Sequence, residues 1–166
     1  MSHQPSPRHR TDTAFGCEEW DLLVALPGRV VIAATSAEPD APRRTVAEGL
    51  AGIEAIAAGR ASASPLVRDV VTSIYQETDG DPPAAEEFQD RVDGIAAVLD
   101  ACRVAATVLA SRTGREDADA YRHWIESIAV RVCRSARSGG VLGFGGSPVS
   151  AAEREFLAGL GAAFDG

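Results

Sequence analysis

The residues with the clearest chemical potential surround His123, which has a carboxylate about one helical turn away on each side. Asp119 precedes it by four positions and Glu126 follows it by three, so in a helix the three side chains share one face. A histidine between carboxylates can act as a general base or contribute to a metal site. The candidate catalytic residues are therefore His123, Glu126 and Asp119.

Two features of the sequence favour a plainer interpretation of this face. Di-iron helical bundles use the order Glu-x-x-His on each of two helices, whereas here the order is His-x-x-Glu. The other two histidines, His3 and His9, fall in a polar N-terminal segment. We therefore expect an exposed face of salt bridges with no bound metal and no cofactor, and the catalytic interpretation is the alternative.

A second candidate site lies between residues 131 and 153, where arginines precede a glycine-rich stretch. Glycine-rich backbone that leads into a helix N-terminus can bind anions, and guanidinium groups add positive charge. The candidate ligand-binding residues are Arg131, Arg134, Arg137, Gly143, Gly145 and Gly146. The favoured alternative is a structural loop beside arginines that complement a helix dipole, because Glu153 places a carboxylate where the anion would bind.

The stretch at 137–153 combines glycines with large apolar residues. Its five glycines exclude a helix interior, while Val141, Leu142 and Phe144 would be unnecessary in a solvated linker. We predict an ordered, partly buried loop that ties a short last helix to the rest of the protein. At least one of the glycines at 143, 145 and 146 is expected to need a backbone conformation closed to residues with a Cβ.

The three cysteines, Cys17, Cys102 and Cys133, are widely spaced and form no Cys-x-x-Cys motif. This pattern is typical of reduced thiols in a cytoplasmic protein. Arg134 follows Cys133 directly and could lower the pKa of its thiol. Packing in the core is nevertheless favoured over nucleophilic catalysis, because small thiols are commonly buried.

Composition argues against several classes of function. All sixteen basic residues are arginine, which excludes both Schiff-base chemistry and a P-loop, since each needs a lysine. The formal net charge of −8 argues against general nucleic-acid binding, which needs clustered positive charge. No secretory signal is visible, and the apolar run at 22–34 is too short to span a bilayer. We expect a cytoplasmic protein that does not bind membranes.

Helical patterns cover most of the chain after a polar tail. Residues 1–13 lack periodicity and are predicted to be disordered, which leaves residues 14–166 for a single domain. A first helix is predicted from Glu18 to about Ser36. It is apolar on nearly every side, as expected in the middle of a bundle, and Pro27 should kink or divide it.

Two shorter helices are predicted next. Thr45 and Glu48 form a capping box that should begin the second helix, and Gly59 should end it. Its predicted buried stripe consists of Val46, Leu50, Ile53 and Ala57. The Ser64–Pro65 pair should then cap a third helix that continues to about Glu77.

The longest periodic pattern covers residues 82–112 and predicts a helix with a heptad-like seam. The seam alternates steps of four and three through Phe88, Val92, Ile95, Leu99, Cys102, Ala106 and Leu109. A capping box at Thr113 and Glu116 should open the next helix, and another at Ser150 and Glu153 should open the last. Their expected core residues are Tyr121, Ile125, Ile128, Val132 and Ala136, then Phe156, Leu157, Leu160 and Phe164.

These patterns predict an all-α, single-domain bundle of five or six helices with a Gly-rich loop before a short C-terminal helix. Two functions remain open. One is a non-enzymatic bundle that acts by self-association or by binding a protein partner. The other is a small-molecule-binding bundle, either a binding protein or an enzyme, whose pocket lies among the helices under the Gly-rich loop, with arginine and His123 as its polar groups. An exposed apolar patch on the long helix would favour the first, and a pocket with convergent polar groups the second.

Overall fold

A computed structural model of the chain describes residues 14–38, 44–77, 90–135 and 149–166. These residues form α-helices, one short 3₁₀-helix and no strand, which confirms the predicted all-α bundle. The helices are α1 (Cys17–Ser36), α2 (Arg44–Ala58), α3 (Pro65–Gln76), α4 (Arg91–Arg112), α5 (Arg115–Ser135) and α6 (Ala151–Asp165), and the 3₁₀-helix η2 (Gly59–Ala61) follows α2. The predicted tail and most of the Gly-rich loop lie outside the described residues.

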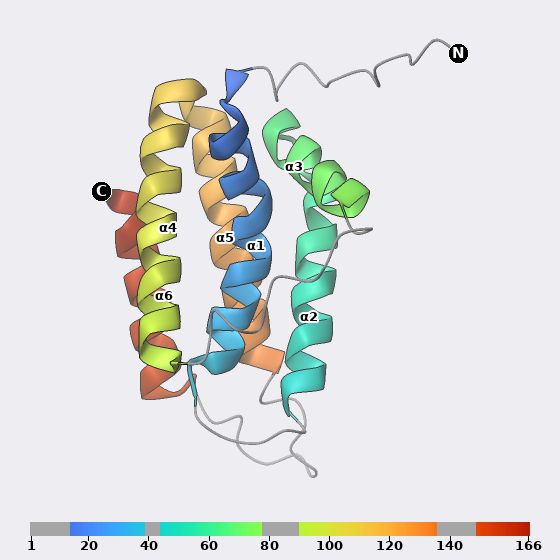
Figure 1. The fold of residues 1–166 in the computed structure, drawn as a ribbon. Helices are drawn as coiled ribbons and strands as arrows, with labels where there is room; N and C mark the ends of the chain where they lie inside the picture. The colour runs from blue at the N-terminus through green and yellow to red at the C-terminus, as the bar shows by residue number, and fades with distance from the viewer. Residues whose placement is uncertain (1–13, 39–43, 78–89, 136–148) are drawn as a thin grey trace.

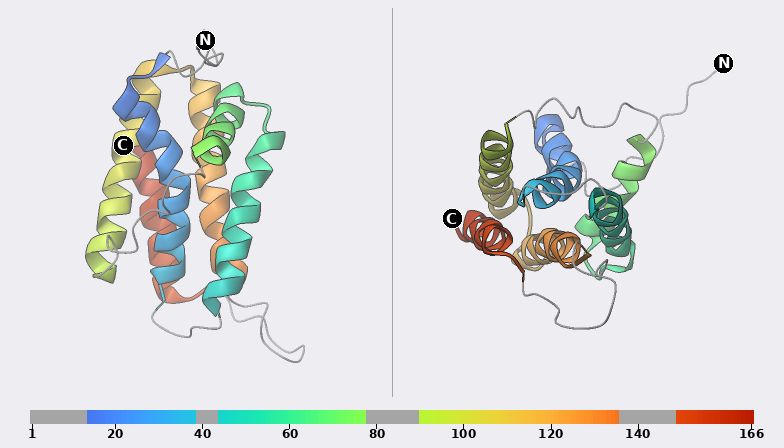
Figure 2. Two further views of the ribbon diagram at one scale, coloured as in Figure 1. Left: turned by 45° about the vertical axis from the view of Figure 1, so that its right-hand side comes forward. Right: turned by 90° about the horizontal axis from the view of Figure 1, so that it is seen from below.

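The long helices stand side by side in a ring (Figures 1 and 2). Around the ring the order is α2, α1, α4, α6 and α5, and α1 and α5 also contact each other across it. α3 packs against α1 and α5 at one end. α1 thus contacts α2, α3, α4 and α5, as its apolar circumference predicts. Pro27 is buried inside α1 and does not divide the helix.

A tyrosine compensates for the proline in α1. Pro27 has no N–H group, so the carbonyl of Leu23, four residues earlier, lacks its usual helical donor. The hydroxyl of Tyr121 in α5 donates to this carbonyl at 2.8 Å. Burial raises the pKa of Tyr121 well above its ordinary value, so the hydroxyl keeps the proton that it donates. The contact satisfies a buried carbonyl and ties α5 to α1.

Two predicted helix starts are confirmed by their hydrogen bonds. Ser64 Oγ accepts the N–H of Val67 at 3.3 Å, and Pro65 occupies the first turn of α3. Ser150 and Glu153 form a reciprocal capping box at the start of α6. Ser150 Oγ accepts the Glu153 N–H at 3.1 Å, and the Glu153 carboxylate accepts the Ser150 N–H at 2.7 Å.

The other predicted starts are displaced. α4 begins at Arg91, where the Asp90 carboxylate accepts two backbone N–H groups of the first turn, rather than near residue 82. Thr113 has an extended backbone and ends α4, so it does not cap α5, which begins two residues later. α2 begins at Arg44, so Thr45 lies within the helix rather than before it. Thr45 and Thr113 each lie next to an observed helix end, whereas α4 begins nine residues after residue 82 (91 − 82).

The predicted buried face of α2 is wrong. The predicted stripe is largely exposed, at 77% for Val46, 57% for Leu50 and 59% for Ile53. α2 instead buries Gly52 and Ala55, together with Ile56 and Glu48. A Cβ on Gly52 would lie 2.6 Å from Cγ1 of Val31 in α1, so the two helices can approach only because this position is glycine. Close backbone approach, rather than side-chain size, decides which face is buried.

The predicted seam of α4 is confirmed in part. Cys102 and Leu109 are buried, whereas Val92 is 67% exposed. The remaining described seam residues, Ile95, Leu99 and Ala106, are half-buried, and Phe88 lies outside the described residues. α4 contacts both α1 and α6, so its buried surface is broader than one seam and includes Val98 and Ala105.

The last two helices bury the residues that their patterns predict. Tyr121, Ile125, Ile128 and Val132 of α5 and Phe156 and Leu160 of α6 are buried, and Leu157 and Phe164 are half-buried. Ala136 lies outside the described residues. α5 therefore supplies the centre of the core, where it meets α1, α2 and α6.

α4 is the one helix in the described ranges that is long and apolar enough to cross a membrane by length and composition. The mean hydropathy of its most apolar window is 1.6, and 39% of that window is buried. α4 packs against α1 and α6, and its exposed side carries an ion pair between Asp100 and Arg103. α4 is therefore packed on two sides within the bundle and carries charges on its exposed side.

Candidate functional site

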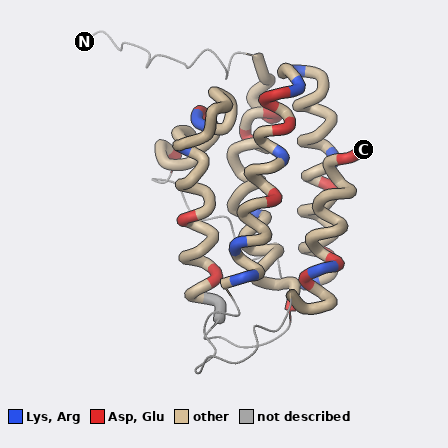
Figure 3. Tube along the Cα trace, turned by 180° about the vertical axis from the view of Figure 1, so that it is seen from behind, with Lys and Arg blue, Asp and Glu red and all other residues tan. Residues whose placement is uncertain are grey.

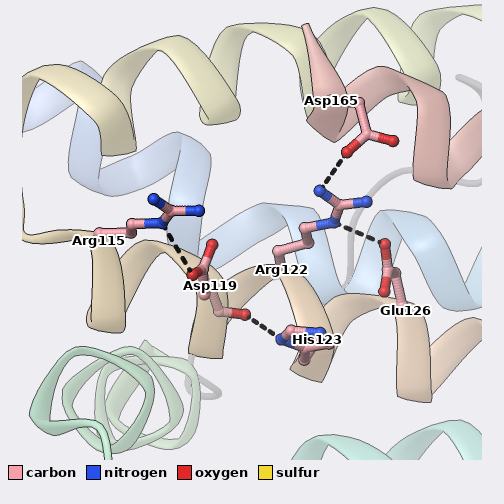
Figure 4. A network of polar contacts seen from close by, with 6 residues as sticks. All are labelled: Arg115, Asp119, Arg122, His123, Glu126 and Asp165. Atoms are coloured by element: carbon pink, nitrogen blue, oxygen red, sulfur yellow. Dashed lines mark hydrogen bonds and ion pairs between the residues drawn. The ribbon is translucent and has the colours of Figure 1, made fainter.

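His123 is an exposed residue of α5 whose neighbours differ from those that its sequence position predicts. Its Nδ1 lies 2.7 Å from the backbone carbonyl oxygen of Asp119, within the same helix (Figure 4). The Asp119 carboxylate is instead paired with Arg115, at an N···O distance of 3.6 Å. The imidazole is therefore held by the backbone, and no carboxylate of the candidate trio contacts it among the described contacts.

Glu126, the other candidate carboxylate, pairs with Arg122. Arg122 Nε donates to Glu126 Oε1 at 2.9 Å, and its Nη1 donates to Asp165 at the end of α6 (Figure 4). Both hydrogen bonds raise the pKa of Arg122 above its ordinary value, and the bond with Asp165 has the larger effect. The face of α5 is thus a row of alternating charges, Arg115, Asp119, Arg122 and Glu126, that joins α5 to α6.

The predicted anion site can be followed only at its two edges. Arg131 and Arg134 are exposed near the end of α5. Arg137, Gly143, Gly145 and Gly146 lie outside the described residues. At the other edge Glu153 is buried, and its carboxylate accepts the backbone N–H of Ser150, the residue that caps α6. The N-terminus of α6 therefore already has a carboxylate as its hydrogen-bond acceptor.

A groove of about 340 Å³, which the sequence analysis did not predict, opens between the end of α4 and the start of α5. Its apolar wall consists of Ala106, Leu109, Ala110, Ala118 and Phe164. Its polar rim consists of Thr113, Arg115, Asp119 and Arg122. The groove lies at the opposite end of α5 from the arginines at 131 and 134, and so away from the position expected for a pocket.

The groove has a weak signature in the sequence. Ala106 and Ala110 are four residues apart and leave space on one face of α4, and the charged row of α5 begins across from them. Phe164 comes from α6, more than 40 residues further along the chain. Small residues on one helix indicate a pocket only when the neighbouring helices are known, so the pattern alone could not define the groove.

The second candidate surface is the outer face of α2, defined by Val46, Leu50 and Ile53. These residues follow steps of four and three, so they form one apolar strip along the helix. In Figure 3 most of α2 is tan, because few charged residues interrupt it. Glu54 is the exposed carboxylate beside the strip. Large apolar side chains at this exposure are typical of interaction surfaces.

All three cysteines are free thiols in different surroundings. Cys17 is exposed at the first residue of α1, whereas Cys102 and Cys133 are buried in the core. Burial raises the pKa of the Cys102 thiol to about 12. A neutral, buried thiol is a poor nucleophile, which agrees with the packing role expected for Cys102.

Thiol labelling should separate these environments. In the native protein near neutral pH we expect Cys17 to react rapidly with a disulfide reagent, while Cys102 and Cys133 react only as the protein unfolds. Folding raises the pKa of Cys102 from 9.0 to about 12. As the pH rises, the Cys102 thiol therefore loses its proton in the unfolded state before it does so in the folded state. The stabilisation from the neutral thiol is complete below about pH 9 and is lost as the pH rises toward 12. Rapid labelling of a second thiol would contradict this account.

Comparison with known proteins gives no independent assignment of these surfaces. The chain matches no family model, no curated protein and no solved structure. The chemistry of the described residues is therefore the sole basis for a functional conclusion.

Proposed function

We propose that the protein acts by self-association through the outer face of α2. The observation that supports this proposal is the exposure of Val46, Leu50 and Ile53 on one side of a helix that is packed on the other. Burying an exposed Val, Leu or Ile side chain completely contributes about 1.5–3 kcal/mol. A helix from another molecule, laid along this strip, would remove all three from water.

The geometry of the strip favours a second copy of this chain as the partner. Leu50 lies near its middle, with Val46 on one side and Ile53 on the other. In an antiparallel pair of α2 helices, Leu50 would meet Leu50, and each flanking residue would meet the opposite flank of the partner. Such a two-fold interface uses the same patch on both molecules, which is the commonest arrangement in homodimers.

The charge distribution supports the same partner. Two molecules with a net charge of −8 repel each other, so association needs a face with few charges. The outer face of α2 fits this need, because Glu54 is the exposed carboxylate at its margin. Close packing behind the strip, where Gly52 meets Val31, holds α2 in place before a partner arrives. Little ordering of α2 would then be required on binding.

We also propose that the protein works in the cytoplasm, without binding membranes or nucleic acid in general. The three free thiols support a reducing compartment. The net negative charge supports weak affinity for phosphate backbones and anionic lipid surfaces. A small, self-associating bundle in this setting would work through protein contacts.

Sedimentation velocity over a concentration series tests the proposal. We expect the sedimentation coefficient of the full chain to rise with concentration, as monomer passes to dimer. Leu50→Glu should weaken dimerisation by at least about tenfold, because it places a charge in an apolar interface. The matched control is Val104→Glu on α4, which also replaces an exposed apolar residue, at 54% exposure.

The two substitutions should affect dimerisation differently if the interface lies on α2. The Val104→Glu protein should associate like the parent, and the Leu50→Glu protein should remain a monomer at the same concentrations. A parent chain that stays monomeric throughout the series would contradict self-association. Equal weakening by both substitutions would contradict the assignment of the interface to α2.

Small-molecule binding is the second candidate function, and the groove between α4 and α5 is the observation that favours it. The groove combines an apolar wall with charged groups, as ligand sites commonly do. Of the three candidate catalytic residues, Asp119 is the one that lines the groove.

A further inference from the structure

We infer that the groove between α4 and α5 binds a free α-amino acid with an apolar side chain, in its zwitterionic form. The inference rests on small-molecule binding, the second candidate function, and gives the chemical class of the ligand. α4 and α6, which contribute to the groove, lie across the ring from α2 (Figure 2). The site is therefore separate from the strip proposed for self-association.

The charged groups at the groove already balance one another. Arg115 pairs with Asp119, and Arg122 pairs with both Glu126 and Asp165. A ligand with a net charge of either sign would therefore meet a like charge beside each opposite one. A ligand with one positive and one negative group fits this arrangement. Because such a ligand has no net charge, the net charge of −8 on the protein neither attracts nor repels it.

The pair of Arg115 with Asp119 is the one that a zwitterion can open. Both side chains line the groove, they are 93% and 55% exposed, and their N···O distance is 3.6 Å. The contact is thus solvated, and its loss costs little. Arg122 is instead held by hydrogen bonds to two carboxylates and stays as a fixed part of the rim. A zwitterion would replace one loose ion pair by two, with its carboxylate on Arg115 and its ammonium on Asp119.

The order of the two charges along α5 sets the orientation of the ligand. Arg115 is the first residue of α5, where the helix dipole is positive, and Asp119 follows about one turn later. The ligand carboxylate is therefore favoured at the start of the helix, and the ammonium further along it. An α-amino acid carries both groups on one carbon atom, so its charges are close enough together to meet Arg115 and Asp119 at once. The two ends of a long peptide are too far apart for this.

The apolar wall of the groove receives the side chain of the ligand. Ala106, Ala110 and Ala118 have short side chains and line a volume of about 340 Å³, which suits a small ligand. Leu109 and Phe164 supply larger apolar groups, against which a ring or an alkyl chain is removed from water. Phenylalanine or leucine should therefore bind more tightly than glycine, which carries the same two charges without the apolar side chain.

Three probes that share a phenyl ring and differ in charge test the inference by NMR titration of the full chain. L-Phenylalanine should shift the backbone amide resonances of Ala110, Arg115 and Asp119. 2-Phenylethylamine lacks the carboxylate, and 3-phenylpropionate lacks the ammonium. Each should bind about twofold to fivefold more weakly than phenylalanine, because each loses one exposed charge pair.

Two variants assign the charges of the ligand to their receptors. Asp119→Asn should weaken binding of phenylalanine and 2-phenylethylamine by about twofold to fivefold, but should not weaken binding of 3-phenylpropionate. Arg115→Gln should weaken binding of phenylalanine and 3-phenylpropionate by the same factor, but not binding of 2-phenylethylamine. Asp100→Asn is the control, because Asp100 is likewise an exposed carboxylate paired with an arginine of its own helix.

A second pair of variants tests the position of the site. Ala110→Leu fills the groove and should weaken binding of phenylalanine by at least about tenfold, whereas Ala97→Leu on the exposed side of α4 should leave it unchanged. Both alanines are exposed, so neither change should disturb folding, which circular dichroism can check.

The outcomes separate the ligand class from small-molecule binding itself. Binding of either singly charged probe as tight as that of phenylalanine would overturn the zwitterion and leave the groove as a small-molecule site. If no probe shifts the resonances at the groove, or if the Ala110→Leu protein binds phenylalanine fully, both the ligand class and small-molecule binding at this groove are contradicted.

Discussion

Replacing Tyr121 by alanine is expected to lower the free energy of unfolding by about 3–5 kcal/mol, as for other large side chains in protein cores. Tyr121 is fully buried, packs edge-on against Trp124, and donates to the Leu23 carbonyl that Pro27 leaves without a helical partner. Chemical denaturation of the two proteins measures the difference. The control is His123→Ala, two residues away and exposed, which should change stability by less than about 0.5 kcal/mol.

The link between Tyr121 and Pro27 can be measured separately from packing. Tyr121→Phe keeps the ring but removes the donor, and it should cost about 1–3 kcal/mol because a buried carbonyl is left unsatisfied. In a Pro27→Ala background the restored N–H can bond to the Leu23 carbonyl, so the same substitution should cost less. Equal costs in the two backgrounds would contradict the compensation of Pro27 by Tyr121.

The second large effect is expected at Gly59, the first residue of η2. A Cβ at this position would lie 2.7 Å from Nε1 of Trp124 and 2.8 Å from Cγ2 of Val71. Trp124 cannot easily withdraw, because it is buried and its Nε1 donates to the carbonyl of Ala55 at 3.3 Å. Gly59→Val should therefore destabilise the protein by about 1–3 kcal/mol through overpacking.

Gly49 in the middle of α2 provides the control for this effect. A Cβ there would meet nothing within 4 Å. Gly49→Ala should stabilise the protein by about 0.5–1 kcal/mol, because alanine favours the helix over the unfolded chain. Thermal or chemical unfolding should thus move in opposite directions for the two glycines. A loss of stability in Gly49→Ala would show that α2 packs differently from the structure described.

The helices that could be predicted best are those whose periodic apolar residues are buried. In α5 the stripe from Tyr121 to Val132 is buried as the spacing predicts, and in α3 the start at Ser64 is correct to the residue. Periodicity and capping are local properties of the sequence, so they can be recognised without knowledge of neighbouring helices.

α2 shows where this reasoning fails. Val46, Leu50 and Ile53 are exposed, while Ile56 is buried and Gly52 faces α1. Periodicity assigns the core face to the bulkier stripe, but the approach of α1 depends on the absence of a side chain. That contact joins residues 31 and 52, which belong to different helices, and no local pattern describes it.

The candidate sites could be predicted from the sequence to different degrees, for the same reason. The charged row of α5 follows from spacings of three and four, and the ion pair of Arg122 with Glu126 lies within one helix. Asp165, which completes that row, comes from α6 and lies 43 residues away in sequence. The groove is lined by residues of α4, α5 and α6, so it is a property of the assembled bundle.

A cross-link at the centre of the α2 strip tests self-association most directly. In a Cys17→Ser background, Leu50→Cys would place two thiols against each other across an antiparallel two-fold interface, at a separation that a disulfide can span. Val104→Cys in the same background is the control, since it is an exposed apolar position on α4. We predict that mild oxidation gives a covalent dimer of the Leu50→Cys protein much faster than of the Val104→Cys protein. Equal, slow cross-linking of the two proteins would contradict self-association through the outer face of α2.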